Sequence, residues 1–280
     1  MIRTVLKGML IGITETVPGV SGSTIAMILG VYEKLVYSLS LLTTKHRREA
    51  YPFLIKLGMG MTLGFVMFLY VIRFLLETYR TPTLMFFAGI IVGFIPYLVK
   101  EATIQGNVSF KLKHFLIIII FIAIVAMGQF IGGNREIDVS NLHFSNYIFL
   151  FFSGILASTA LVLPGISGAL ILTILGIYEI AASSIFHLNF SIIIPIGLGV
   201  VVGILLTSKL VRYLLNEYTM ETYSAMIGLV TGSIIAIVSE LETNVSSMVL
   251  TVSALTFLVG IFFVTFIMNI RRNKEGRINR

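Results

Sequence analysis

Long apolar runs, separated by short segments that carry most of the charged residues, dominate this sequence. A helix needs about 20 residues to cross a hydrocarbon core of about 30 Å, and six of the runs are near or above that length. The pattern therefore predicts an all-α polytopic membrane protein. We expect its spanning helices at 54–76, 83–99, 114–131, 191–208, 222–239 and 247–270.

One apolar stretch occurs twice. Pro18–Glu33 reads PGVSGSTIAMILGVYE and Pro164–Glu179 reads PGISGALILTILGIYE, with ten of sixteen positions identical. Proline lacks an amide hydrogen and glycine tolerates unusual dihedral angles, so each Pro-Gly pair predicts a break in an apolar helix. Breaks at matching positions in two halves of a membrane protein point to a binding site at the interface between the repeats.

Matching glycines and arginines extend the repeat beyond this motif. Glycines four residues apart let helices approach closely in lipid, so we expect them at helix contacts. The match defines two repeats, 5–131 and 147–270, within a single membrane domain, 1–280. Among the matched pairs are Gly58, Gly60, Gly64 and Arg73 in the first repeat with Gly197, Gly199, Gly203 and Arg212 in the second.

The arms beside each break set the expected topology. Each arm is about ten residues, or roughly 15 Å of helix, which is half the hydrocarbon core. We therefore expect re-entrant hairpins at 8–33 and 154–179, each followed by three transmembrane helices. A hairpin makes no net crossing, so the two repeats have inverted topology. Loop charges agree, because the basic connections then share the cytoplasmic side with the N-terminus and with a basic tail, 271–280.

The tips of the hairpins are the candidate binding site. Ser21 or Ser23, and Ser167, are natural N-caps for the returning arms, whose first amides have no partner within the helix. Such a helix start favours an anion, best a phosphate or carboxylate, although these residues also suit a purely structural turn. The residues expected to bind phosphate are Pro18, Gly19, Ser21, Gly22, Ser23 and Thr24 in the first repeat and Pro164, Gly165, Ser167 and Gly168 in the second.

Glu15, Arg73 and Arg212 are the charged residues that we consider as candidates for function. Glu15 precedes the first tip, and a carboxylate at membrane depth points to function, so we weigh a coupling role against a local helix cap. Arg73 and Arg212 lie near the ends of their helices. They either extend to lipid headgroups or bind the phosphate, one at each face of the membrane.

Composition narrows the function further. The chain is 57% hydrophobic and 12% charged, with no cysteine, one aspartate and four histidines. It offers no pattern for a lipid phosphatase, a metal site or a cofactor, so we expect a protein that is not an enzyme. The net charge of +7 belongs to loops and the C-terminal tail, which indicates orientation in the bilayer and no nucleic-acid partner.

The segments GITETVPGVSGSTIAMILGVYE and LVLPGISGALILTILGIYE resemble the signature of the polyprenyl-phosphate transporter family, and the resemblance covers essentially the whole chain. It implies that undecaprenyl phosphate, the lipid carrier of bacterial cell-wall synthesis, is moved from the outer to the inner leaflet of the cytoplasmic membrane. Thr14-Glu15-Thr16 stands where relatives have Ala-Asp or a similar acidic pair, and Ser23 where a third glycine is common.

Two other functions stay open at this point. The first is a secondary transporter of a small soluble anion, coupled to protons or sodium. A lateral cleft between the hairpins and their neighbouring helices would count against it, because such a transporter needs an enclosed aqueous path. The second is a scaffold or enzyme subunit of envelope synthesis that transports nothing.

Overall fold

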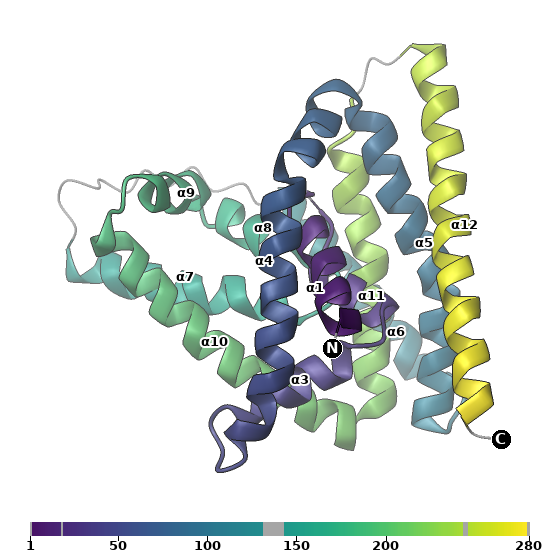
Figure 1. Ribbon diagram of the computed structural model, residues 1–280, viewed down its shortest axis with the longest axis horizontal. Coiled ribbons are helices and arrows are strands. Elements are labelled where there is room, and N and C mark those ends of the chain that lie inside the picture. Colours follow the sequence, from purple (N-terminus) through teal and green to yellow (C-terminus); the bar gives the residue numbers. More distant parts are fainter. Residues whose placement is uncertain (1, 18, 131–142, 243–245, 279–280) are drawn as a thin grey trace.

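The computed structural model describes residues 2–17, 19–130, 143–242 and 246–278 of the chain. These residues form α-helices and no strands, so the predicted all-α polytopic fold is confirmed (Figure 1). The first six helices are α1 (Ile2–Thr14), α2 (Gly22–Ile28), α3 (Tyr32–Leu41), α4 (Arg47–Thr78), α5 (Arg80–Gly106) and α6 (Leu112–Phe130). The next six are α7 (Phe144–Val162), α8 (Gly168–Ile174), α9 (Tyr178–Phe186), α10 (Phe190–Glu217), α11 (Thr219–Ser239) and α12 (Ser247–Ile278).

The second six helices repeat the first six in order and in backbone geometry. The short helices α2 and α8 are each bent by 117° from the helix that follows. The bends lie at Gly30 and Gly176, whose φ angles of 64° and 71° fall in the left-handed region that glycine adopts at little cost. The tips contain Gly19 and Gly165 with φ angles of 77° and 90°. The two copies of the sequence motif therefore make the same turns at the same positions.

Helices α4 and α10, which occupy matching positions in the two sequence repeats, run in opposite directions. In Figure 1, α4 rises from the lower end of the molecule to the upper end, whereas its counterpart α10 descends to the lower end. The α3–α4, α5–α6 and α10–α11 connections lie at the lower end, close to the level of the C-terminus. We call this the basic end, because it carries Lys45, Arg47 and Lys111. The upper end, with the α4–α5 junction, is called the opposite end.

The lengths of the helices agree with most of the predicted spans. In the described part of the chain, six helices are long and apolar enough to cross a membrane: α4, α5, α7, α10, α11 and residues 247–271 of α12. The predicted span 114–131 falls on α6, a shorter apolar helix, and its residue 131 lies outside the described residues.

Two segments are longer than expected. The arm before the second tip has 19 residues rather than about ten, because its apolar sequence begins at Phe144 and meets no helix breaker before Pro164. Helix α12 continues to Ile278, through most of the expected tail 271–280, and residues 279–280 lie outside the described residues.

Glycines make the closest helix contacts, as the four-residue spacing predicts. Gly12 of α1 faces the carbonyl oxygen of Met61 in α4, and Gly64 of α4 faces that of Met9 in α1. The α7–α10 pair repeats this arrangement, with Gly199 facing the carbonyl oxygen of Phe151. The expectation was wrong for the matched pair Gly58 and Gly197, because a Cβ atom at either would have no neighbour within 4 Å.

The two halves exchange their last helices. Helix α12 packs against α5, and α6 packs against α11, so each half is completed by the final helix of the other. The hairpins are packed unequally. All seven residues of α2 are buried, whereas Gly168 is the buried residue of α8. Helix α3 packs against α10, and among the described residues α9 makes no comparable contact with α4.

The glycine contacts generate a stability prediction. Gly64→Val places a side chain against the backbone of α1 and forces α1 and α4 apart, which costs about 1–3 kcal/mol. Gly58→Val is the matched control, since the same side chain on the same helix meets open space. We expect a lower midpoint of thermal unfolding in detergent for Gly64→Val than for Gly58→Val. Equal midpoints would show that the close approach of these helices is not required.

Candidate functional site

The two tips bind each other directly. The backbone N–H of Gly165 donates to the hydroxyl of Thr24 (2.9 Å), and the Ser23 hydroxyl donates to the carbonyl oxygen of Leu163 (2.9 Å). Thr24 and Ser23 are both buried. Helix breaks separated by more than a hundred residues of sequence therefore meet at one place, as the duplicated motif predicts.

The start of α2 is capped by a carboxylate rather than by a serine. Ser21 and Ser167 stand at the predicted N-cap positions, but neither side chain makes a capping hydrogen bond. The hydroxyl of Ser21 is instead paired with that of Ser23 at 2.7 Å. The N–H of Gly22, the first residue of α2, donates to Oε1 of Glu15 (3.2 Å). Glu15 thus makes the local cap that the sequence allowed, and its coupling role stays a prediction.

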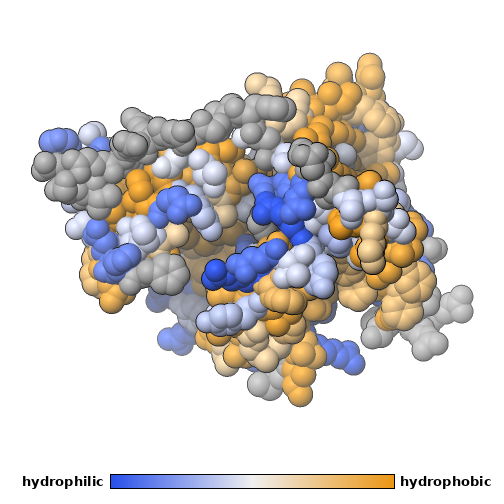
Figure 2. Space-filling view, turned by 90° about the horizontal axis from the view of Figure 1, so that it is seen from above, coloured by the Kyte–Doolittle hydropathy of each residue, from blue (hydrophilic) through white to orange (hydrophobic). Residues whose placement is uncertain are grey.

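A polar cavity of about 270 Å³ lies between the two tips. We call it the tip cavity, and the residues that matter here are Glu15, Thr16, Gly19, Ser167, Thr173 and Glu240. Glu240 directly follows α11, so this side of the cavity belongs to the opposite end. Figure 2 looks onto that end and shows hydrophilic residues gathered near its centre, between apolar flanks.

Only some of the predicted tip residues line this cavity. Gly19 and Ser167 do, whereas Pro18 lies outside the described residues. Glu240 was not predicted as a site residue. Its match with Glu101 of the first repeat was the feature of the sequence that could have pointed to it. The remaining predicted residues pack within the tips and are buried: Ser21, Gly22, Ser23, Thr24, Pro164, Gly165 and Gly168.

The two matched arginines have different surroundings. Arg73 is exposed, and its Nε donates to Glu77 one turn along the same helix (2.7 Å). Arg212 donates from Nη1 to the Ser40 hydroxyl (3.0 Å) and lies over the ring of Tyr37. Repeat-related positions have therefore acquired different partners.

Arg212 also lines a second polar cavity of about 490 Å³, which we call the basic-end cavity. Lys34, Glu33 and Tyr223 are among its other lining residues. The Tyr223 hydroxyl donates to Oε1 of Glu33 (2.9 Å), which links α3 to α11. Arg73 lines neither of these cavities in the described part of the chain.

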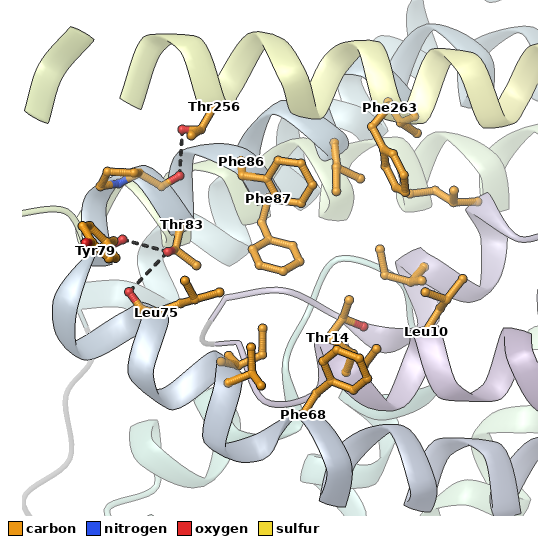
Figure 3. Close-up of a pocket in the computed structure, with 18 of the residues that line it drawn as sticks. Leu10, Thr14, Phe68, Leu75, Tyr79, Thr83, Phe86, Phe87, Thr256 and Phe263 are labelled. Atoms are coloured by element: carbon orange, nitrogen blue, oxygen red, sulfur yellow. Dashed lines mark hydrogen bonds between the residues drawn. The ribbon is translucent and has the colours of Figure 1, made fainter. Parts of the chain in front are cut away.

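An apolar groove of about 550 Å³ opens beside the first hairpin, between α4, α5 and α12 (Figure 3). Phe68, Phe86, Phe87 and Phe263 contribute to its walls, and Phe263 is 45% exposed. The groove is therefore open on the side of the molecule that a bilayer would cover.

The hydroxyl groups of the groove do not make it polar. Thr14 donates to the carbonyl oxygen of Ile11 (2.8 Å), Thr83 to that of Tyr79 (2.7 Å) and Thr256 to that of Pro82 (2.8 Å). Figure 3 shows the last two of these bonds at one end of the groove. With these donors satisfied by backbone, the groove presents mainly hydrocarbon to a ligand.

The groove and the tip cavity lie on either side of the end of α1. Ile13 and Thr14 line the groove, and the next two residues, Glu15 and Thr16, line the tip cavity. An apolar and a polar compartment are therefore adjacent, with the first tip as their common wall.

Comparison with known proteins identifies the family. A family model described as VCA0040-like, undecaprenyl phosphate translocase-like, matches residues 11–254. This chain belongs to that family. It is 34% identical over 264 residues to a polyprenyl-phosphate transporter of Staphylococcus aureus, covering 91% of this chain and 92% of that protein. A polyprenyl-phosphate transporter of Vibrio cholerae is 29% identical over 246 residues, covering 83% and 76%.

The family resemblance predicted from the two motifs is confirmed, and no solved structure matches the chain. The described residues contain no group of three or more histidine, cysteine, aspartate or glutamate side chains that could hold a metal ion. The candidate site consists of the tips, the two polar cavities and the groove.

The junction of the tips generates a second stability prediction. Thr24→Val keeps the shape of the side chain but removes the acceptor of the buried Gly165 N–H, which costs about 1–3 kcal/mol. Thr251→Val is the control, because Thr251 is exposed and bonds within its own helix. We expect a lower unfolding midpoint in detergent for Thr24→Val only. A Thr24→Val midpoint equal to that of the control would contradict a stabilising contact between the tips.

Proposed function

We propose that this protein moves undecaprenyl phosphate, or a similar polyprenyl phosphate, from the outer to the inner leaflet of the bacterial cytoplasmic membrane, which recycles the lipid carrier for cell-wall synthesis. The observation that carries the proposal is the apolar groove next to a polar cavity. A polyprenyl phosphate needs both, because its tail avoids water and its phosphate avoids hydrocarbon. The relatives named polyprenyl-phosphate transporters support this substrate class.

The phosphate is proposed to bind at the hairpin tips. Gly19 and Ser167 line the tip cavity, where we place the phosphate. The polyprenyl tail is proposed to lie in the apolar groove. The lateral opening of the groove counts against the soluble-anion transporter, which needs a path closed to lipid. The buried tip residues, with Ser23 and Thr24 among them, hold the two tips together around the phosphate.

We also propose an orientation in the membrane. The basic end faces the cytoplasm with both chain termini, because lysine and arginine favour that side. The opposite directions of α4 and α10 support halves of inverted topology. The tip cavity then receives the phosphate from the outer side, and the basic-end cavity, with Lys34 and Arg212, receives it on the cytoplasmic side.

The test reconstitutes the full chain in liposomes that contain undecaprenyl phosphate and follows exposure of its phosphate at each leaflet. We expect faster exchange than in protein-free liposomes. Val71→Trp should lower the rate, because Val71 lines the groove and the larger side chain fills it. Val66→Trp is the control, because it makes the same substitution at an exposed position of α4 that does not line the groove.

Three outcomes decide the proposal. Equal exchange with and without protein ends it. Equal slowing by Val71→Trp and Val66→Trp removes the groove from the mechanism. Uptake of inorganic phosphate into the liposomes, with no exchange of the lipid, would favour the soluble-anion transporter.

Glu15 is proposed to couple translocation to protons or sodium, because its carboxylate lines the tip cavity beside the expected phosphate. Glu15→Gln keeps an acceptor for the Gly22 N–H but carries no exchangeable charge. We expect the pH or sodium dependence of lipid exchange in liposomes to be weaker in Glu15→Gln than in the unchanged chain. The same dependence in both would exclude coupling through Glu15 and leave its cap as its role.

A further inference from the structure

Arg80 makes a two-point contact with a residue 160 positions away. It is the first residue of α5, and Glu240 directly follows α11. The Arg80 Nε donates to the backbone oxygen of Glu240 (3.0 Å), and Nη2 donates to its carboxylate Oε2. Both side chains are partly exposed, at 39% and 43%, so the pair is accessible from outside the fold.

This pair lies where the groove and the tip cavity meet. Glu240 lines the tip cavity. Tyr79 and Pro82, on either side of Arg80 in sequence, line the groove. A lipid whose tail occupies the groove therefore has its headgroup beside Arg80 before the phosphate reaches the tips.

In the part of the chain that the structure describes, no positive side chain lines the tip cavity. Among its described lining residues are two glutamates, Glu15 and Glu240, and no lysine or arginine. A phosphate that enters would meet two carboxylates, which disfavours binding unless a cation takes part. Arg80 is the cation that the structure attaches to this cavity, through Glu240.

We propose that Arg80 captures the phosphate of the lipid by exchanging the Glu240 carboxylate for it. Carboxylate and phosphate oxygens both fit the planar fork of a guanidinium group, so Glu240 occupies the position that the phosphate takes. An ion pair this exposed contributes little to stability, and the released carboxylate can turn toward water, so the exchange meets little opposition. This inference rests on the proposed function and assigns its first binding step.

The assignment replaces the expected role of Arg73. Arg73 is 71% exposed and is held by Glu77 of its own helix, whereas Arg80 bonds to Glu240, which lines the tip cavity, and is next in sequence to Tyr79, which lines the groove. The residue that matches Arg80 in the second repeat is Thr219, so comparison of the repeats gives no sign of it. Arg80, through Glu240, is thus associated with the tip cavity and Arg212 with the basic-end cavity, from positions that the repeat does not relate.

The experiment measures the rate of lipid exchange in liposomes against the amount of undecaprenyl phosphate, with the full chain. We expect Arg80→Gln to raise the lipid concentration that gives the half-maximal rate about tenfold, because the variant loses one charged contact with the phosphate. Glu240→Gln should lower that concentration, because it removes the carboxylate that competes with the phosphate for Arg80. The double variant should resemble Arg80→Gln, and Arg73→Gln is the matched control with no expected change.

The result separates a binding role from a structural one. If the pair served only to join α5 to α11, Arg80→Gln and Glu240→Gln would impair exchange equally and lower the unfolding midpoint equally, and that outcome overturns the proposal. Arg80→Gln with the same concentration dependence as the unchanged chain also overturns it. Absence of exchange by the unchanged chain would instead reject the proposed function itself.

Discussion

A broken helix in an apolar setting leaves backbone amides and carbonyls without partners, and hydrocarbon offers none. In this fold, side chains beside one break form hydrogen bonds with backbone groups of the other break. The Gly165 amide bonds to Thr24, the Leu163 carbonyl accepts from Ser23, and the Gly22 amide bonds to Glu15. The first two of these bonds join the tips of the two halves, and the tip cavity lies beside them.

The same bonds explain why two similar repeats are packed differently. Ser23 and Thr24 supply the side chains that cross between the tips, and the second repeat has Ala169 and Leu170 at the matching positions. Glu15, which caps α2, is matched by Leu161. The first hairpin is therefore held on all sides and buried. The second hairpin lacks these groups, and α8 remains largely outside the core, which leaves the tip cavity beside it.

Sequence analysis predicted the features that depend on local chemistry. Apolar length predicted the helices, and the Pro-Gly pairs predicted the turns that Gly19 and Gly165 make with positive φ angles. The bends at Gly30 and Gly176 were not predicted, because the arm after each tip was expected to be one continuous helix. Contacts between distant segments were less predictable. Gly58 and Gly64 lie on one helix with the same repeat spacing, yet only Gly64 faces α1. A repeat shows which positions correspond, but the partner of each position depends on how the helices are rotated and packed. The Arg80–Glu240 pair, formed by residues with no repeat relation to each other, could not be predicted for that reason.

The position of the end of α1 makes a two-part ligand plausible on physical grounds. A polyprenyl phosphate has a charged head and a hydrocarbon tail joined by one bond, so its two environments must lie within a few ångströms of each other. A helix end provides this change over a short distance. Up to Thr14 the α1 backbone bonds within its helix and the side chains toward the groove are apolar, and from Glu15 the chain leaves the helix and presents polar groups to the tip cavity. In the proposed mode of binding, the break that the tips stabilise is also the boundary between head and tail, so one short motif serves both the fold and the proposed transport.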